Sequence, residues 1–117
     1  RLLIDWAAKT GQSVVQVLTM NETTATYTYR DSYPYSAISV YALHPIYLSL
    51  TDLEPLKDAH QSAVFQRMQR QLNALPDMDY VAVLKGKLDY CRAYFSESGA
   101  KVLQSAGYRR FVRENRA

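Results

Sequence analysis

Tyrosine and hydroxyl side chains are concentrated in one stretch of this chain, residues 21–45. Threonines and serines there alternate with five tyrosines, namely Tyr27, Tyr29, Tyr33, Tyr35 and Tyr41. A tyrosine combines a flat apolar ring with a hydroxyl, which suits the face of a sugar ring and the hydroxyls at its edge. The group predicts a carbohydrate-binding loop, whereas any single tyrosine could simply seal the loop onto the fold.

Asp31 is the carboxylate in the central part of this loop. Cleavage of a glycosidic bond needs two carboxyl groups, which lie about 5–5.5 Å apart in a retaining enzyme. Glu22 and Asp31 belong to no motif that would pair them in this way, so we assign no catalytic residue. We expect Asp31 to brace the loop through local hydrogen bonds to the backbone, as aspartate does in turns.

His44 precedes Pro45, so its backbone is biased to extended geometry. We expect a structural histidine in a turn, and hydrogen bonding to a ligand hydroxyl is the alternative. Ser32, Asp31 and His44 make no credible triad because no G-x-S-x-G elbow exposes the serine. Two isolated histidines and one cysteine, Cys91, have no metal-ligand spacing, and no cofactor is implied.

The basic residues suggest a nucleic-acid hypothesis, because clustered arginines on helices are typical of phosphate binding. The arginines concerned are Arg67, Arg70, Arg109, Arg110, Arg113 and Arg116. Glutamines and acidic residues are interspersed among them, and the net charge is only +3. A solvated helix face is the better interpretation, so nucleic acid is not an expected partner.

Compartment and completeness can also be predicted from the composition. No apolar run approaches the roughly 18 residues needed to span a bilayer, and no apolar signal core follows a charged start. The single cysteine suits a reducing compartment, so we expect a cytoplasmic protein that does not enter a membrane. Because the chain starts within a helical pattern and without methionine, we interpret it as part of a longer protein.

The first half of the sequence reads as a helix, a turn and a strand. Residues 2–10 are amphipathic and Gly11 follows, which indicates a helix that ends at a left-handed glycine. Residues 14–20 are apolar and rich in valine, as in a buried strand of a parallel sheet, and residues 46–50 could form a second short strand. Binding sites lie beyond the carboxyl ends of such strands, where the tyrosine-rich loop would begin.

The second half reads as helical. A helix is expected from about residue 56 to 75, ended by Pro76, with an earlier start possible at a capping-box spacing in residues 51–54. The next helix should be capped by Asp77 or Asp79 and closed by Gly99, and a last helix should be interrupted at Gly107. The apolar stripe of the longer helix should face a neighbouring helix; its residues are Val81, Leu84, Leu88, Cys91 and Phe95.

Several short motifs match one enzyme family. In the first half they are Trp6-Ala7 with Gly11-Gln12, Asp31-Ser32, Pro34-Tyr35, residues 39–42 and His44-Pro45. In the second half they are residues 72–76, Asp79-Tyr80, Lys87-Leu88 and residues 111–115. In these motifs the chain resembles the 4-α-glucanotransferases known as amylomaltases or disproportionating enzymes, in particular the plant cytosolic branch and its bacterial relatives.

The resemblance implies an α/β fold, a fragment of an α-amylase-type (β/α)8 barrel with one or two strands followed by a mainly helical subdomain. Residues 1–55 would be the first barrel segment, with the substrate-binding loop at 21–45, and residues 56–117 would be a helical insertion. The implied function is retaining transfer of α-1,4-glucan segments between maltooligosaccharides or glucans.

The same resemblance implies four substrate-binding residues. Tyr35 matches the tyrosine that packs on the sugar next to the scissile bond, Ser32 the neighbouring loop serine, Tyr29 a more remote glucan contact, and Asp31 lies between them. The family's catalytic carboxylates lie downstream of the matched region, so the chain alone should be inactive. We also expect its unpaired strands to favour self-association. The alternative function is a noncatalytic helical module that binds carbohydrate or protein.

Overall fold

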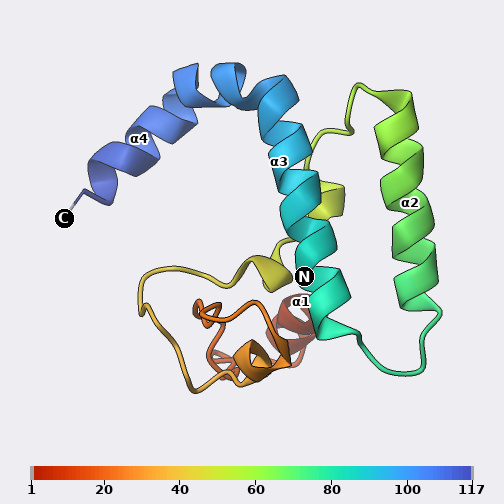
Figure 1. Ribbon diagram of the computed structural model, residues 1–117. Coiled ribbons are helices and arrows are strands. Elements are labelled where there is room, and N and C mark those ends of the chain that lie inside the picture. Colours follow the sequence, from red (N-terminus) through yellow and green to blue (C-terminus); the bar gives the residue numbers. More distant parts are fainter. Residues whose placement is uncertain (1, 117) are drawn as a thin grey trace.

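The computed structural model describes residues 2–116, and in these residues it contains helices and connecting loops. The α-helices are α1 (Leu2–Lys9), α2 (Ala59–Asn73), α3 (Tyr80–Gln104) and α4 (Ala106–Glu114), and the short 3-10 helices are η1 (Tyr29–Ser32), η2 (Pro45–Tyr47) and η3 (Leu50–Asp52) (Figure 1). The strand-like pairing found within residues 2–116 is one isolated antiparallel bridge between Asn21 and Leu43.

The predicted α/β fold and barrel fragment are therefore wrong for this chain. Residues 14–20 do not form a strand but run as an irregular, solvent-exposed segment, in which Val14 is 81% exposed. A strand requires a neighbour to pair its backbone groups, and no neighbouring strand lies within the described residues. Residues 46–50 also differ from the prediction because Pro45 begins the 3-10 helix η2, where its fixed φ suits a first helical position.

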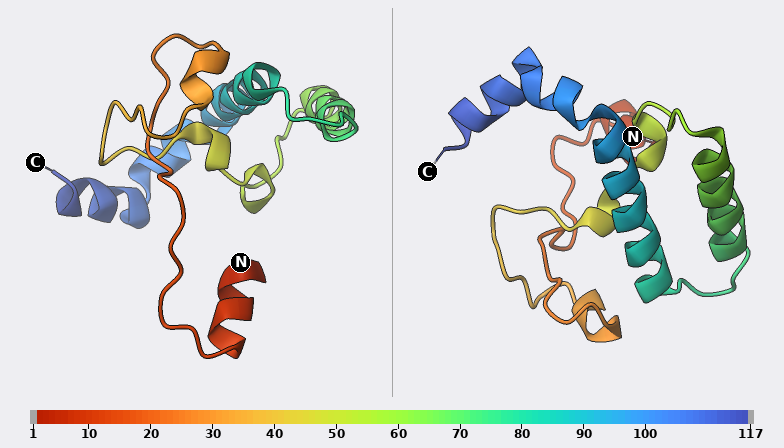
Figure 2. Two further views of the ribbon diagram at one scale, coloured as in Figure 1. Left: turned by 90° about the horizontal axis from the view of Figure 1, so that it is seen from below. Right: turned by 45° about the horizontal axis from the view of Figure 1, so that its top comes forward.

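The predicted end of the first helix is confirmed. Gly11 has a φ of 77°, in the left-handed region, directly after α1. Its amide donates to the carbonyl of Ala8 at 3.1 Å, and the Gln12 amide donates to the carbonyl of Ala7 at 2.9 Å. These bonds satisfy the last carbonyls of the helix, and the chain then leaves α1 as the extended segment seen in the left view of Figure 2.

Two glycine substitutions should act in opposite directions on stability. Gly11→Ala places a side chain at positive φ and is expected to cost about 1 kcal/mol, although no atom lies within 4 Å of the added Cβ. Gly107→Ala, within α4 and equally unobstructed, is expected to stabilise by about 0.5–1 kcal/mol through helix propensity. Urea denaturation followed by circular dichroism checks both predictions. Equal effects of the same sign would contradict the assignment of Gly11 to the left-handed region and of Gly107 to a helix.

α2 begins later than the sequence pattern suggested. Residues 51–54 do not start it; Asp58 caps it, and its side chain accepts hydrogen bonds from the amides of His60 and Gln61. The carboxylate of Glu97 on α3 accepts from the amides of Lys57 and Asp58, at 2.7 and 3.2 Å. α3 therefore helps to hold the entry to α2 in place.

α3 is the longest helix and packs on α2, α4, η1 and η2. Asp79 caps it, as one of the two predicted alternatives, by accepting from the amide of Ala82 at 3.0 Å. α2 contacts a face of α3 that includes Gly86, which lies against Met68, and Tyr90, whose ring packs edge-on against Phe65. The predicted stripe is only partly correct, since Leu84 is buried but Val81 and Phe95 are exposed.

The predicted helix end at Gly99 is wrong. Gly99 lies inside α3, buried beneath the Phe95 ring, which approaches the position of a Cβ to 2.9 Å. The chain turns instead at Ser105, which follows α3 and caps α4 by accepting from the amide of Tyr108. Gly107 lies within α4 rather than at the break.

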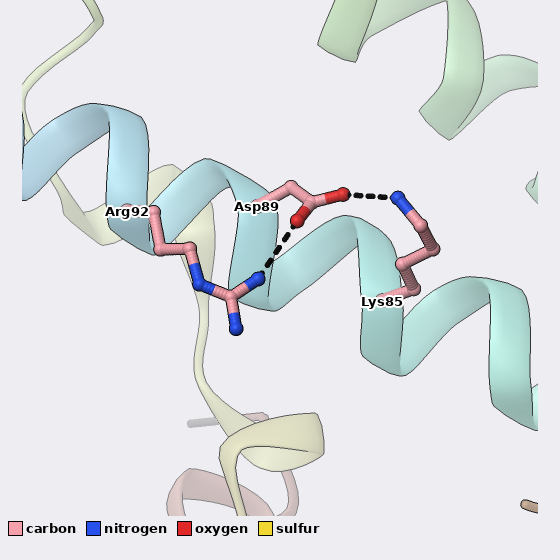
Figure 3. A network of polar contacts seen from close by, with 3 residues as sticks. All are labelled: Lys85, Asp89 and Arg92. Atoms are coloured by element: carbon pink, nitrogen blue, oxygen red, sulfur yellow. Dashed lines mark hydrogen bonds and ion pairs between the residues drawn. The ribbon is translucent and has the colours of Figure 1, made fainter. Parts of the chain in front are cut away.

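The solvent side of α3 carries a small ion-pair network. Figure 3 shows Asp89 between Lys85 and Arg92, with nitrogen–oxygen distances of 2.5 and 2.9 Å. The hydrogen bond from Lys85 is the main cause that lowers the pKa of Asp89, with a further contribution from Arg92. Because Lys85 and Arg92 are exposed to solvent and Asp89 is partly exposed, this network contributes little to stability.

The apolar core is small. The buried apolar side chains of the described residues are Ala7, Leu56, Tyr80 and Leu84. The radius of gyration is 16.6 Å, whereas a compact domain of this length would have about 13 Å. Polar contacts between the loop and α3 add to this small core. Among residues 2–116, no helix combines the length and the apolar character needed to cross a membrane.

Candidate functional site

The tyrosine-rich loop, residues 21–45, is closed at its base by backbone hydrogen bonds. The amide of Glu22 donates to the carbonyl of Ala42 at 2.8 Å, and the amide of His44 donates to the carbonyl of Met20 at 2.9 Å. A further bond joins the amide of Ile38 to the carbonyl of Glu22 at 2.8 Å. The two ends of the loop thus lie together.

The Asp31 carboxylate organises the first half of this loop, as predicted. Its two oxygens accept hydrogen bonds from the amide and hydroxyl of Thr26 and, at 2.6 Å, from the amide of Tyr27. Tyr27 has a φ of 57°, an unfavourable conformation for a residue with a bulky side chain. The carboxylate therefore fixes a strained turn that would otherwise relax.

Neither loop carboxylate has the properties of a general acid. Burial acts to raise the pKa of Asp31, but the hydrogen bonds from Thr26 and Tyr27 outweigh it, so the pKa lies below its ordinary value. For Glu22, too, burial acts to raise the pKa and hydrogen bonds from Thr24 outweigh it. Both groups are ionised at neutral pH and already accept hydrogen bonds, which suits a structural role.

His44 is buried and plays the structural part that we predicted for it. Its Nδ1 accepts from the amide of Ile46 at 3.1 Å, and this bond caps η2. Its Nε2 lies 2.6 Å from the hydroxyl of Tyr80, at the start of α3. The Tyr80 hydroxyl in turn donates to the carbonyl of Asp31 at 3.1 Å, as does Thr23 Oγ1 at 2.5 Å.

The tyrosine rings lie mostly on the surface of the loop. Tyr35 is 61% exposed and packs edge-on against Tyr33, with 5.5 Å between ring centroids. Tyr29 is similarly exposed, and its ring meets that of Tyr80 edge-on at 6.3 Å. The rings of Tyr29 and Tyr35 are therefore accessible on the surface of the loop.

A pocket of about 240 Å³ lies between the loop and the start of α3. Its lining includes Thr19, Thr23, Asp31, Ser32, His44 and Tyr80. Of the predicted site residues, the structure brings Ser32 and Asp31 together at this pocket, whereas Tyr29 and Tyr35 are not among its lining residues. Sequence reasoning included Tyr80 in the Asp79-Tyr80 motif but gave it no role at this site, because it reads as the first residue of a helix.

The arginines of α4 are solvent-exposed. Arg109, Arg110 and Arg113 border an open hollow of about 740 Å³ at the turn between α3 and α4. The guanidinium of Arg109 donates to the carbonyl of Gln104 at 2.6 Å. This arginine is therefore used in part to close the turn.

Comparison with known proteins gives consistent matches. A family model described as 4-alpha-glucanotransferase matches residues 1–117. The chain is 38% identical, over 98% of its length, to 4-alpha-glucanotransferase DPE2 of Oryza sativa subsp. japonica. It is 33% identical, over 80% of its length, to a 4-alpha-glucanotransferase of Chlamydia caviae. No solved structure gives a significant match.

These relatives are much longer than the chain. It spans 12% of the rice relative and 17% of the relative from Chlamydia caviae. The matched region therefore accounts for a small part of each relative.

Proposed function

The chain belongs to the family of 4-alpha-glucanotransferases, and on that basis we propose that it is part of an enzyme that transfers α-1,4-glucan segments between maltooligosaccharides or glucans. Within that enzyme the loop of residues 21–45 binds the substrate. The observation that carries the proposal is the exposure of Tyr29 and Tyr35 on a loop whose backbone is held by the buried Asp31.

Exposed aromatic rings on a fixed loop are suited to glucan binding. A sugar ring presents C–H groups on its face and hydroxyls at its edge, so it can stack on a tyrosine while its hydroxyls meet short polar side chains. A preorganised loop loses little conformational entropy when the sugar binds. Hydrogen bonds to the Asp31 carboxylate supply that preorganisation.

The four predicted residues take different roles in this proposal. By resemblance to the family, Tyr35 packs on the sugar next to the scissile bond, Ser32 contacts the same region, and Tyr29 contacts a more remote glucose unit. Asp31 shapes the loop rather than touching the sugar, because hydrogen bonds from Thr26 and Tyr27 already occupy its carboxylate.

Bond cleavage is assigned to other parts of the enzyme. A retaining mechanism needs a nucleophilic carboxylate and a general acid whose pKa is raised. The pKa of both Glu22 and Asp31 is lowered, and both carboxylates accept backbone hydrogen bonds. The 117-residue chain on its own is therefore expected to bind glucan without transferring it.

The two halves of the chain have different parts in substrate binding. Residues 1–55 carry the substrate-binding loop, and residues 56–117 form a helical subdomain that supports it. Contacts from α3 to η1 and η2 are the support for this division.

The test is disproportionation of maltotriose by the full-length enzyme. We expect glucose and longer maltooligosaccharides to appear, with the α-configuration retained in the products by proton NMR. Release of glucose by hydrolysis alone, or products of inverted configuration, would contradict the proposed transfer reaction.

A further inference from the structure

Side chains of α3 hold both the tyrosine-rich loop and the η2 segment that follows it. Tyr80, its first residue, binds the carbonyl of Asp31 and the ring of His44. Lys87, two helical turns later, donates to the carbonyls of Ile46 and Leu48 around the end of η2. Figure 1 shows α3 passing beside the loop, so a helix outside the loop determines where the loop lies.

Each hydrogen bond at Tyr80 has a defined direction. The Ile46 amide donates to Nδ1 of His44, so in a neutral imidazole the proton must be on Nε2. Nε2–H then donates to the Tyr80 oxygen, and the Tyr80 hydroxyl is left to donate to the Asp31 carbonyl. One hydroxyl thus joins η2, α3 and η1 in a single line of hydrogen bonds.

This line is shielded from water. Tyr80 and His44 are each 4% exposed and Asp31 is 5% exposed. Burial raises the pKa of Tyr80, which keeps its hydroxyl protonated and able to donate. A buried hydrogen bond of this kind is not replaced easily by water, so losing the hydroxyl would leave the Nε2–H of His44 without its acceptor. The Asp31 carbonyl would keep only its bond from Thr23 Oγ1.

We propose that Tyr80 is a positioning residue for glucan transfer, acting through the loop rather than by touching the substrate. The Asp31 carbonyl belongs to the peptide group that links Asp31 to Ser32, so the Tyr80 hydroxyl, together with the hydroxyl of Thr23, fixes the orientation of that peptide. Ser32 and Tyr80 border the same pocket. Tyr35 lies three residues after Ser32 in the chain. The inference rests on the proposed function of the loop.

The experiment is a double-mutant cycle in the full-length enzyme, with maltotriose as substrate. Tyr80→Phe keeps the ring and removes only the hydroxyl, and it should lower kcat/KM about fivefold. In a Tyr35→Ala background, Tyr80→Phe should lower kcat/KM less than about twofold, because the ring that the loop positions is already missing. Tyr90→Phe is the matched control on α3, since its ring packs on Phe65 of α2, and it should leave kcat/KM unchanged.

A second measurement separates positioning from general stability. Amide hydrogen exchange of residues 26–33 should accelerate in Tyr80→Phe, while α2 and the second half of α3 keep their protection. Unchanged kcat/KM in Tyr80→Phe, or effects of Tyr80→Phe and Tyr35→Ala that simply multiply, would overturn the inference while the proposed function stands. Absence of glucan transfer by the unmodified enzyme would instead overturn the proposed function.

Discussion

Replacing Tyr35 with alanine in the full-length enzyme is expected to lower kcat/KM for maltotriose disproportionation by about 10- to 100-fold. The ring is 61% exposed on the loop and pairs edge-on with Tyr33, so it is available to a sugar and held at a defined angle. Stacking next to the scissile bond would hold the reacting glucose unit in place, and its loss would affect the transition state as well as binding.

Two control variants make this result specific. Tyr35→Phe retains the ring and should stay within about threefold of the unmodified enzyme. Tyr41→Ala removes another tyrosine of the same loop, to which the family resemblance assigns no sugar contact, and should have little effect. Equal losses for Tyr35→Ala and Tyr41→Ala would point to general damage to the loop and would contradict the assignment of Tyr35.

The second large effect is expected for Asp31→Ala, which should release the first half of the loop. The Thr26 and Tyr27 amides would lose their acceptor, and Tyr27 would leave its left-handed conformation. We expect amide exchange at these two residues to accelerate at least about tenfold, with a large loss of glucan transfer. Asp52→Ala, which removes an exposed carboxylate, serves as the control.

The same carboxylate should make the loop sensitive to acid. Because hydrogen bonds outweigh burial, the pKa of Asp31 in the folded chain lies below its ordinary value of 3.8. The stabilisation is therefore fully present above that value and is lost as the pH falls through the folded pKa. Protection factors at Thr26 and Tyr27, corrected for intrinsic exchange, should decrease as the pH is lowered below 3.8. A loss of protection near neutral pH would contradict the role of Asp31.

Local signals in the sequence predicted the helices well and the strands badly. Asp79, the apolar spacing and Pro76 lie within or next to the helices they define, so α2 and α3 were expected close to where they are. A strand at residues 14–20 depends on a partner elsewhere, which no local pattern can supply. Gly99 misled for a different reason: the ring of Phe95, four residues earlier on the same helix, covers it and makes a glycine suitable inside a helix.

The candidate site divides in the same way. The role of Asp31 could be predicted because its side chain binds amides four and five residues away. Tyr80 could not, since its partners Asp31 and His44 are 49 and 36 residues distant. Nothing in residues 79–81 distinguishes a hydroxyl that binds a distant loop from one that faces solvent.

That separation along the chain also sets an order of events during synthesis. A ribosome adding about 5–20 residues per second makes Tyr80 roughly 2 to 10 seconds after Asp31. Until then the loop can form its own turn around the Asp31 carboxylate, but the Tyr80 hydroxyl that donates to the Asp31 carbonyl is absent. The loop therefore reaches its final position only after the start of α3 has been translated.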